Sequence, residues 1–305
     1  MTDDTPMPLH PRCGFVALIG APNAGKSTLL NQLVGSKIAI VTHKVQTTRA
    51  RIRAIAIEGD AQIIFVDTPG IFAPKRKLDE AMVAAAWAGA AEADATVLLI
   101  DARDGLNEAN LAIIEGLEKT NLKVMLAINK IDTVQRERLL TLADELNKRY
   151  PFTDTFMISA MKAHGVHDLK ETLAARMPEG PWLYPADQMA DLPLRMLASE
   201  ITREKLFLRL HDELPYASTV ETETWQERKD GSVRIEQVIF VERDSQKKIV
   251  LGKNGQTVKA IGQAARAEIA EAIGQPVHLF LFVKVREKWA EDPERLRMMG
   301  LDPSR

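Results

Sequence analysis

The chain has 305 residues, of which 46% are hydrophobic, and its formal net charge is −2. This length suits about two domains with real cores, and the near-neutral charge excludes a protein that coats nucleic acid through overall positive charge. The single cysteine, Cys13, excludes an internal disulfide and suits a reducing compartment.

Neither a signal peptide nor a membrane span is expected. The stretch from Met1 to His10 is acidic and rich in proline, unlike a secretion signal. The apolar stretch Ala81 to Ile100 contains Glu92 and Asp94, so it predicts a helix followed by a buried strand rather than a membrane-spanning segment.

Strands and helices alternate through the first part of the chain. The apolar patterns predict strands at 14–19, 50–58, 61–67, 95–101, 122–128 and 152–158, and helices at 25–34, 79–91, 107–119, 135–148 and 165–176. Gly59-Asp60 joins two of the strands as a hairpin. The alternation predicts an α/β domain whose mostly parallel sheet has helices on both faces and one antiparallel edge.

The first loop after a strand has the pattern of a phosphate-binding loop. It reads Gly20-Ala21-Pro22-Asn23-Ala24-Gly25-Lys26-Ser27, with Thr28 next in the helix. Its backbone N–H groups and the positive end of the following helix would surround an anion. Lys26 would reach the β- and γ-phosphates, and the Ser27 hydroxyl would ligate Mg²⁺. The alternative is a plain glycine-rich turn before a helix.

A second loop has the pattern of a γ-phosphate sensor. Asp67-Thr68-Pro69-Gly70 follows a buried strand, where Asp67 can hold Mg²⁺ through water and the Gly70 N–H can approach the γ-phosphate. The polar segment 42–49 is the expected switch loop, with Thr48 as the Mg²⁺ ligand and Thr47 as the alternative. Ile71 cannot orient an attacking water, so slow intrinsic hydrolysis is expected. We assign the catalytic roles to Lys26, Thr48 and Gly70.

A third motif has the residues that recognise guanine. Asn129-Lys130-Ile131-Asp132 ends another apolar strand, and Asp132 can accept hydrogen bonds from guanine N1–H and N2–H, whereas adenine offers no such pair. Ser159-Ala160 ends the next strand, where a backbone N–H can meet guanine O6. The alternative for Asp132 is a helix cap.

Taken together, these motifs resemble the translation-factor-related GTPases, and more narrowly the Era family. The switch Gln46-Thr47-Thr48-Arg49, the Asp-Thr-Pro-Gly sensor and the hydrophobic Ile71 carry the resemblance. It implies GTP and GDP as ligands, GTP hydrolysis and Mg²⁺ as cofactor. Asn23 adds an implied K⁺ ion beside the phosphates.

Prolines and a glycine in 177–193 mark a linker between two domains. The expected organisation is a GTPase domain at 1–180, a linker at 181–193 and a second domain at 194–305. The second domain has a long amphipathic stretch at 195–214, strands at 217–227 and 232–242, helices at 245–251 and 256–273, and a last strand at 277–285.

The turn Gly252-Lys253-Asn254-Gly255 breaks the two consecutive helices of this domain. That order predicts an α+β domain with the KH fold, in which the turn clamps the backbone of single-stranded RNA. Between 243 and 259 there are five Lys and Arg residues against one acidic residue. The predicted RNA-binding residues are Lys247, Lys248, Gly252, Lys253, Asn254 and Gly255. The alternative is a helix C-cap with solvated lysines.

The second domain extends the resemblance to the Era family over nearly the whole chain. The resemblance implies binding of the 3′ end of small-subunit ribosomal RNA, action in assembly of the 30S-type subunit, a cytoplasmic location and peripheral contact with the membrane. A monomer is expected. The rival hypothesis is a signalling GTPase whose second domain docks a protein or a membrane.

Overall fold

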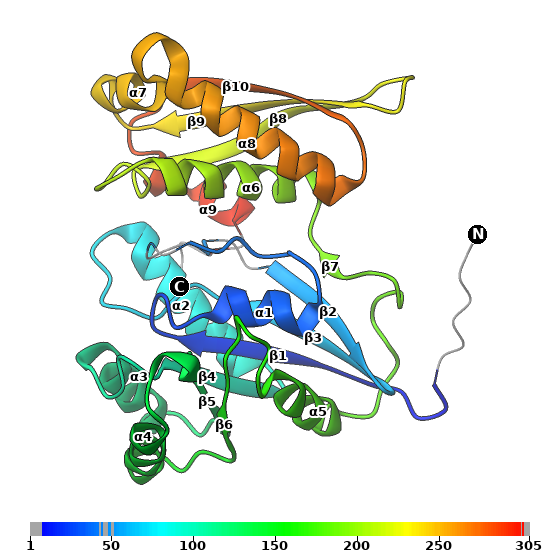
Figure 1. Cartoon of the computed structure of the whole chain (residues 1–305), viewed down its shortest axis with the longest axis vertical. Helices are drawn as coiled ribbons and strands as arrows, with labels where there is room; N and C mark the ends of the chain where they lie inside the picture. Colours follow the sequence, from blue (N-terminus) through cyan, green and yellow to red (C-terminus); the bar gives the residue numbers. More distant parts are fainter. Residues whose placement is uncertain (1–7, 43, 45–47, 50–51, 300, 302–305) are drawn as a thin grey trace. The chain divides into compact units, whose positions relative to one another are not determined.

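The computed structural model describes residues 8–42, 44, 48–49, 52–299 and 301 (Figure 1). It divides into two compact units at Asp191 and Leu192. Of the described residues, 40–42 and 44 group with the second unit, and 299 and 301 group with the first. Residues up to 191 join the first unit because the stretch expected as a linker is bonded to it. Thr47, the alternative Mg²⁺ ligand, lies outside the described residues.

The first unit is built on a seven-stranded sheet of order β6-β5-β4-β1-β3-β2-β7. Its strands are β1 (Arg12–Gly20), β2 (Ile52–Glu58), β3 (Ala61–Asp67), β4 (Ala95–Asp101), β5 (Val124–Asn129), β6 (Thr155–Met157) and β7 (Ala190–Asp191). Strands β6 to β3 run parallel, while β2 is antiparallel to both β3 and β7. The α/β class and the single antiparallel edge are confirmed.

Helices cover both faces of this sheet. They are α1 (Lys26–Val34), α2 (Lys77–Glu92), α3 (Glu108–Glu118), α4 (Arg136–Arg149) and α5 (Val166–Arg176), with the short 3₁₀ turn η1 (Ile131–Thr133). Side chains of α2, α3 and α4 form one apolar core with β1, β4 and β5. Helices α1 and α5 contact each other and the β2–β3 side. This core fixes the ends of the central strands.

Two strands differ from the expectation. The strand expected at 152–158 pairs with β5 only over Thr155–Met157. β7 was not predicted, because a two-residue strand has no periodicity to detect. It pairs with β2 in the proline-rich stretch, where Gln62 Oε1 also accepts hydrogen bonds from Leu183 N at 2.8 Å and Tyr184 N at 3.0 Å. These bonds attach the start of the expected linker to the sheet.

The second unit has the predicted order of elements. They are α6 (Leu194–Arg209), β8 (Ser218–Glu227), β9 (Val233–Val241), α7 (Asp244–Leu251), η2 (Lys253–Gly255), α8 (Gln256–Ile273) and β10 (Val277–Val285). The sheet order is β10-β9-β8, with β10 parallel and β8 antiparallel to β9. α6 and α8 pack on one face of the sheet through residues such as Phe207, Ile261 and Ile239.

Two further short elements end the second unit, η3 (Trp289–Glu291) and α9 (Pro293–Met298). Trp289 is buried, and its indole N–H donates to the carbonyl oxygen of Ala217 at 3.0 Å. None of the helices within the described residues has the length and hydrophobicity that crossing a bilayer requires.

Candidate functional site

The three predicted motifs meet at one edge of the first sheet. β1 ends at Gly20, β3 at Asp67, β4 at Asp101 and β5 at Asn129, and these strands are parallel neighbours. Ligands of open α/β sheets bind outside these carboxyl ends. The fold therefore brings together residues that are up to about a hundred positions apart in the sequence.

The phosphate loop has at Gly25 a backbone conformation that residues with a side chain rarely adopt. This residue has φ of 102° and directly precedes α1. A Cβ built on Gly25 would lie 2.2 Å from Asn129 Nδ2, well inside van der Waals contact. The loop and the guanine-reading motif are thus packed against each other at this glycine.

Lys26 lies inside the phosphate loop. Its ammonium donates to the carbonyl oxygens of Gly20 at 3.0 Å and Ala21 at 2.9 Å. Burial lowers the pKa of Lys26 to about 8, while the negative charge of Asp67 acts in the opposite direction. The hydrogen-bond partners of this buried cation are neutral carbonyls and its pKa is lowered despite Asp67, so a phosphate group would supply counter-charge.

Ser27, Thr48 and Asp67 come from three separate segments and converge. Ser27 Oγ lies 3.0 Å from Thr48 Oγ1, and Thr48 Oγ1 donates to Asp67 Oδ2 at 3.1 Å. Asp67 is fully buried at the end of β3. Hydroxyl and carboxylate oxygens are the ligands that Mg²⁺ prefers, with water and substrate phosphates completing its octahedron. The donor set fits this ion.

The sensor loop approaches the phosphate loop closely. A Cβ on Gly70 would lie 3.0 Å from Pro22 N, and Ile71 N donates to Gly20 O at 3.0 Å. The hydroxyl of Thr68, which lies in the predicted sensor motif, donates to Leu18 O at 2.7 Å. The Thr68 side chain thus fastens the sensor loop to β1.

Ile71 is 6% exposed and belongs to the apolar core of the first unit. Its side chain is apolar and packed, so it cannot hold a water molecule for attack on a phosphate. Any group that orients the attacking water must come from elsewhere.

Asn129 connects the guanine-reading motif with two other loops. Its Nδ2 donates to Ala24 O at 2.9 Å, and its Oδ1 accepts from Ala160 N at 3.0 Å. Ser159 N donates to His164 O at 3.0 Å. Guanine O6 would therefore share the Ala160 N–H with Asn129, or replace Asn129 as its acceptor.

Lys130 and Asp132 each pair with one residue that the sequence did not predict, Asp101 and Lys162 respectively. Lys130 Nζ lies 2.7 Å from Asp101 Oδ2 and donates to Asn23 O at 2.6 Å. Burial acts against ionisation of Asp101, but hydrogen bonds from Arg103 and Lys130 lower its pKa to about 2. The signal available was the acidic residue at the end of β4, the strand next to β5.

Asp132 remains ionised beside this loop. A hydrogen bond from the Ser159 side chain lowers the pKa of Asp132, and Lys162 Nζ lies 3.4 Å from its Oδ2. Lys162 follows Ser159 and Ala160 in the sequence and was not predicted. An ionised carboxylate is the acceptor that guanine N1–H and N2–H require.

In the second unit, the predicted RNA-binding turn lies between α7 and α8. Gly252 has φ of 74°, and a Cβ there would lie 2.2 Å from Thr257 Oγ1. Lys253 and Asn254 are exposed at the turn, and α8 begins directly after Gly255. Lys248 is exposed on α7, whereas Lys247 is half-buried. The turn thus presents cations beside the N-terminus of α8.

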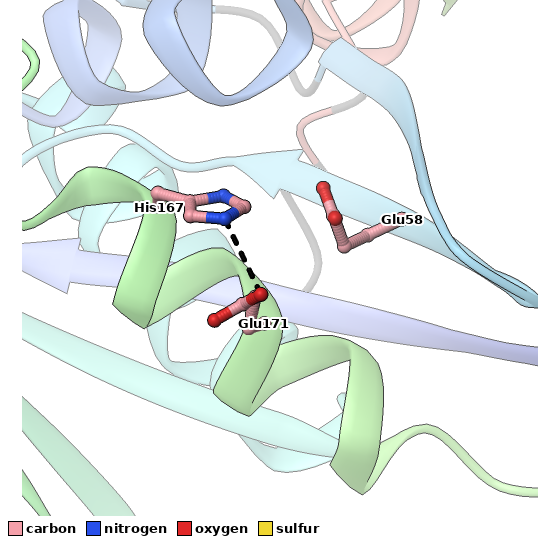
Figure 2. A group of neighbouring side chains, drawn as sticks. All are labelled: Glu58, His167 and Glu171. Atoms are coloured by element: carbon pink, nitrogen blue, oxygen red, sulfur yellow. Dashed lines mark ion pairs between the residues drawn. The ribbon is translucent and has the colours of Figure 1, made fainter.

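A separate cluster joins Glu58 of β2 with His167 and Glu171 of α5 (Figure 2). His167 Nε2 lies 3.3 Å from Glu171 Oε1. Lys170 already pairs with Glu58 Oε2 at 3.0 Å and donates to Ile57 O at 3.0 Å. A metal ion would have to compete with this ammonium group, so we interpret the cluster as an ion-pair network that fixes α5 to β2.

Comparison with known protein families matches both units. Residues 15–130 match the model of the 50S ribosome-binding GTPase family, and residues 213–290 match the KH domain model. The GTPase Era of Afipia carboxidovorans is 66% identical over 294 residues, covering 96% of both chains. That of Brucella suis biovar 1 is 66% identical, covering 95% of this chain and 94% of the relative.

The chain belongs to the Era family of GTPases. Two solved Era structures agree. A variant of Aquifex aeolicus Era bound to GDP·AlF4⁻ has a TM-score of 0.90 at 39% identity, covering 95% of this chain and 99% of that one. Era in complex with MgGDPNP and nucleotides 1506–1542 of 16S ribosomal RNA has a TM-score of 0.90 at 40% identity, covering 96% and 100%.

Membership of the Era family confirms the predicted activity and fold. This Era-family GTPase binds guanine nucleotides, hydrolyses GTP and uses Mg²⁺. Its P-loop GTPase domain is followed by a KH domain, as the order of elements predicted.

Proposed function

We propose that this Era-family GTPase is a GTP-dependent switch that binds the single-stranded 3′ end of small-subunit ribosomal RNA during assembly of the small subunit. The observation that carries the proposal is the convergence of Ser27, Thr48 and Asp67, which joins the phosphate loop, the switch segment and the sensor. Loss of the γ-phosphate would act on all three segments at once.

Each residue then has a defined role. Lys26 would bind the β- and γ-phosphates, Thr48 and Ser27 would ligate Mg²⁺, and the Gly70 N–H would hold the γ-phosphate. Bound Mg²⁺ neutralises charge on the β- and γ-phosphate oxygens. Asp132 would read guanine, and Asn129 and Lys130 would hold the base-reading loop in place.

Hydrolysis by these residues alone should be slow, because Ile71 is packed in the core and cannot orient water. Asn23 has φ of 64° at an exposed position of the phosphate loop, and its role in our proposal is to help bind K⁺ beside the phosphates. GTP turnover in KCl and in NaCl at equal ionic strength tests this role. Equal rates in the two salts would remove it.

RNA binding is assigned to the KH turn. The N-terminus of α8, with Lys253 and Lys248, would contact phosphates of an unpaired strand. In functional terms the GTPase domain is 1–180, the linker 181–193 and the KH domain 194–305. We infer a cytoplasmic site of action, with peripheral contact at the inner face of the membrane.

Binding of an RNA that carries the 3′-terminal sequence of the small-subunit ribosomal RNA tests the proposal. The substitution Lys253→Asp should reduce affinity by about tenfold or more, because it exchanges an attraction for a repulsion at a phosphate. Lys229→Asp, with the same charge change at the β8–β9 turn, is the matched control and should bind as the parent protein does. Equal affinities for both variants would contradict the assignment of the turn.

A further inference from the structure

Three consecutive cations follow the γ-phosphate sensor. Lys75, Arg76 and Lys77 are all exposed. Within the described part of the chain, their side chains form no ion pair. Solvated cations are common, so their position relative to the fold decides whether they have a role.

Their position is unfavourable for the helix that they precede. α2 has 16 residues and begins at Lys77, so the three cations lie at its positive end. Cations are stabilising at the C-terminal end of a helix and unfavourable at its N-terminal end, where the helix dipole is positive. The helix end is already capped by Asp79, whose Oδ2 accepts from Lys75 N and Arg76 N, both at 3.1 Å. The cations therefore do not serve the stability of α2.

The segment that carries them is fastened at both ends. Ile71 N donates to Gly20 O at 3.0 Å, which ties its start to the phosphate loop. Asp79 fixes its end through the two hydrogen bonds to Lys75 and Arg76. Only Phe72, Ala73 and Pro74 lie between. A movement of Gly70 on loss of a γ-phosphate would be transmitted over this short distance to the cations.

The surroundings favour a polyanion as partner. Membrane-surface segments combine cations with exposed apolar side chains that insert into the lipid. Here Ile71 is buried and Phe72 is half-buried, so the exposed part of the segment offers charge without an apolar anchor. Charge without apolar contact is typical of binding to phosphates of nucleic acid.

We propose that Lys75, Arg76 and Lys77 form a second RNA-phosphate contact, which responds to the γ-phosphate through the sensor segment. This inference rests on the proposed RNA-binding function and adds to the KH turn a contact whose strength depends on the bound nucleotide. Bound GTP would hold the three cations in the arrangement that binds RNA. Hydrolysis of GTP would end that arrangement and weaken RNA binding.

The test compares the triple variant Lys75→Gln, Arg76→Gln and Lys77→Gln with a control of equal charge change. The control is Lys119→Gln, Lys123→Gln and Arg136→Gln, all exposed positions of the first unit. RNA with the 3′-terminal sequence of the small-subunit ribosomal RNA is titrated at several salt concentrations with a non-hydrolysable GTP analogue or with GDP. The slope of log affinity against log salt counts the phosphates contacted.

The expected result is nucleotide-dependent. With the GTP analogue, the triple variant should lose about two units of salt slope, since each phosphate contact of a single strand contributes about 0.7. With GDP, it should differ little from the parent. The charge-preserving variant Lys75→Arg with Lys77→Arg should keep the parent slope. A triple variant with the parent slope in both nucleotide states would overturn the inference.

The Lys253→Asp variant separates this inference from the proposed function. Loss of RNA binding in Lys253→Asp together with an unchanged triple variant would leave the proposed function standing and remove the second contact. No RNA binding by the parent protein would remove both. The last assay measures binding of the parent protein and the triple variant to vesicles of anionic phospholipid. If the triple variant loses vesicle binding but keeps RNA binding, the three cations contact a membrane and the inference is overturned.

Discussion

Asn129 Nδ2 donates a hydrogen bond to the carbonyl oxygen of Ala24 at 2.9 Å. The first residue of the guanine-reading motif is thereby bonded to the middle of the phosphate loop. The same side chain accepts from Ala160 N at 3.0 Å. One buried amide thus sets the spacing between the parts of the site that hold the base and the phosphates.

Asn129→Ala should weaken guanine-nucleotide binding by at least about tenfold. The substitution leaves the Ala24 carbonyl and the Ala160 N–H without this partner, at about 1–3 kcal/mol for each buried group. Titration with a fluorescent GDP analogue measures the affinity. Asn147→Ala, at an exposed position of α4, is the control. Unchanged affinity in Asn129→Ala would show that the two loops keep their spacing without it.

Gly25→Ala should abolish nucleotide binding. The new Cβ would lie 2.2 Å from Asn129 Nδ2 in a backbone with φ of 102°. Gly35→Ala is the control, because Gly35 has φ of 77° but no atom within 4 Å of an added Cβ. The control should cost about 1 kcal/mol of stability and keep nucleotide binding. Equal nucleotide affinities in both variants would contradict the packing described at Gly25.

Asp132→Asn should change the base that the protein prefers. The amide that replaces one carboxylate oxygen is a donor, and it would face the N2–H donors of guanine. GTP affinity should fall by about a hundredfold, while xanthosine triphosphate, whose base carries a carbonyl at that position, should bind better than GTP. Competition between the two nucleotides measures the preference. If the variant still prefers GTP, the guanine base does not contact residue 132.

Ionised Asp101 should contribute to the free energy of unfolding in a pH-dependent way. Its pKa is lowered from the ordinary 3.8 to about 2, so its contribution is present above pH 3.8 and is lost as the pH falls through about 2. Asp101→Asn should reduce the free energy of unfolding by about 1 kcal/mol near neutral pH, the upper end for ion pairs open to solvent on one side.

Urea unfolding of both proteins between pH 7 and pH 2 measures this difference. The two stability curves should approach each other only at the acidic end of the range. If the difference in the free energy of unfolding stays constant down to pH 2, it does not arise from ionisation of the Asp101 carboxylate.

The sequence predicted the elements that have strong periodicity. The amphipathic helix α8 lies at Gln256–Ile273, and the mostly apolar strand β4 lies at Ala95–Asp101, both as expected. β7 and α9 were missed because a two-residue strand and a six-residue helix are too short for periodicity. Their formation depends on pairing and packing with distant parts of the chain.

Within the site, motif residues could be predicted and their supports could not. Asp101 forms an ion pair with Lys130, and Lys162 forms one with Asp132. Neither Asp101 nor Lys162 belongs to a sequence motif. Asp101 becomes visible only when β4 and β5 are known to be adjacent, which is a property of the sheet order. The hydroxyl of Thr68 donates to Leu18 O, a contact that its place in the motif does not reveal.

The central claim is that the nucleotide state controls RNA binding. The most direct measurement is the affinity for the 3′-terminal small-subunit ribosomal RNA with a GTP analogue, with GDP and without nucleotide, at one fixed salt concentration. We predict the tightest binding with the GTP analogue and, by reciprocal coupling, tighter GTP binding when RNA is present. Equal RNA affinity in all three states would contradict the account and leave two domains that act independently.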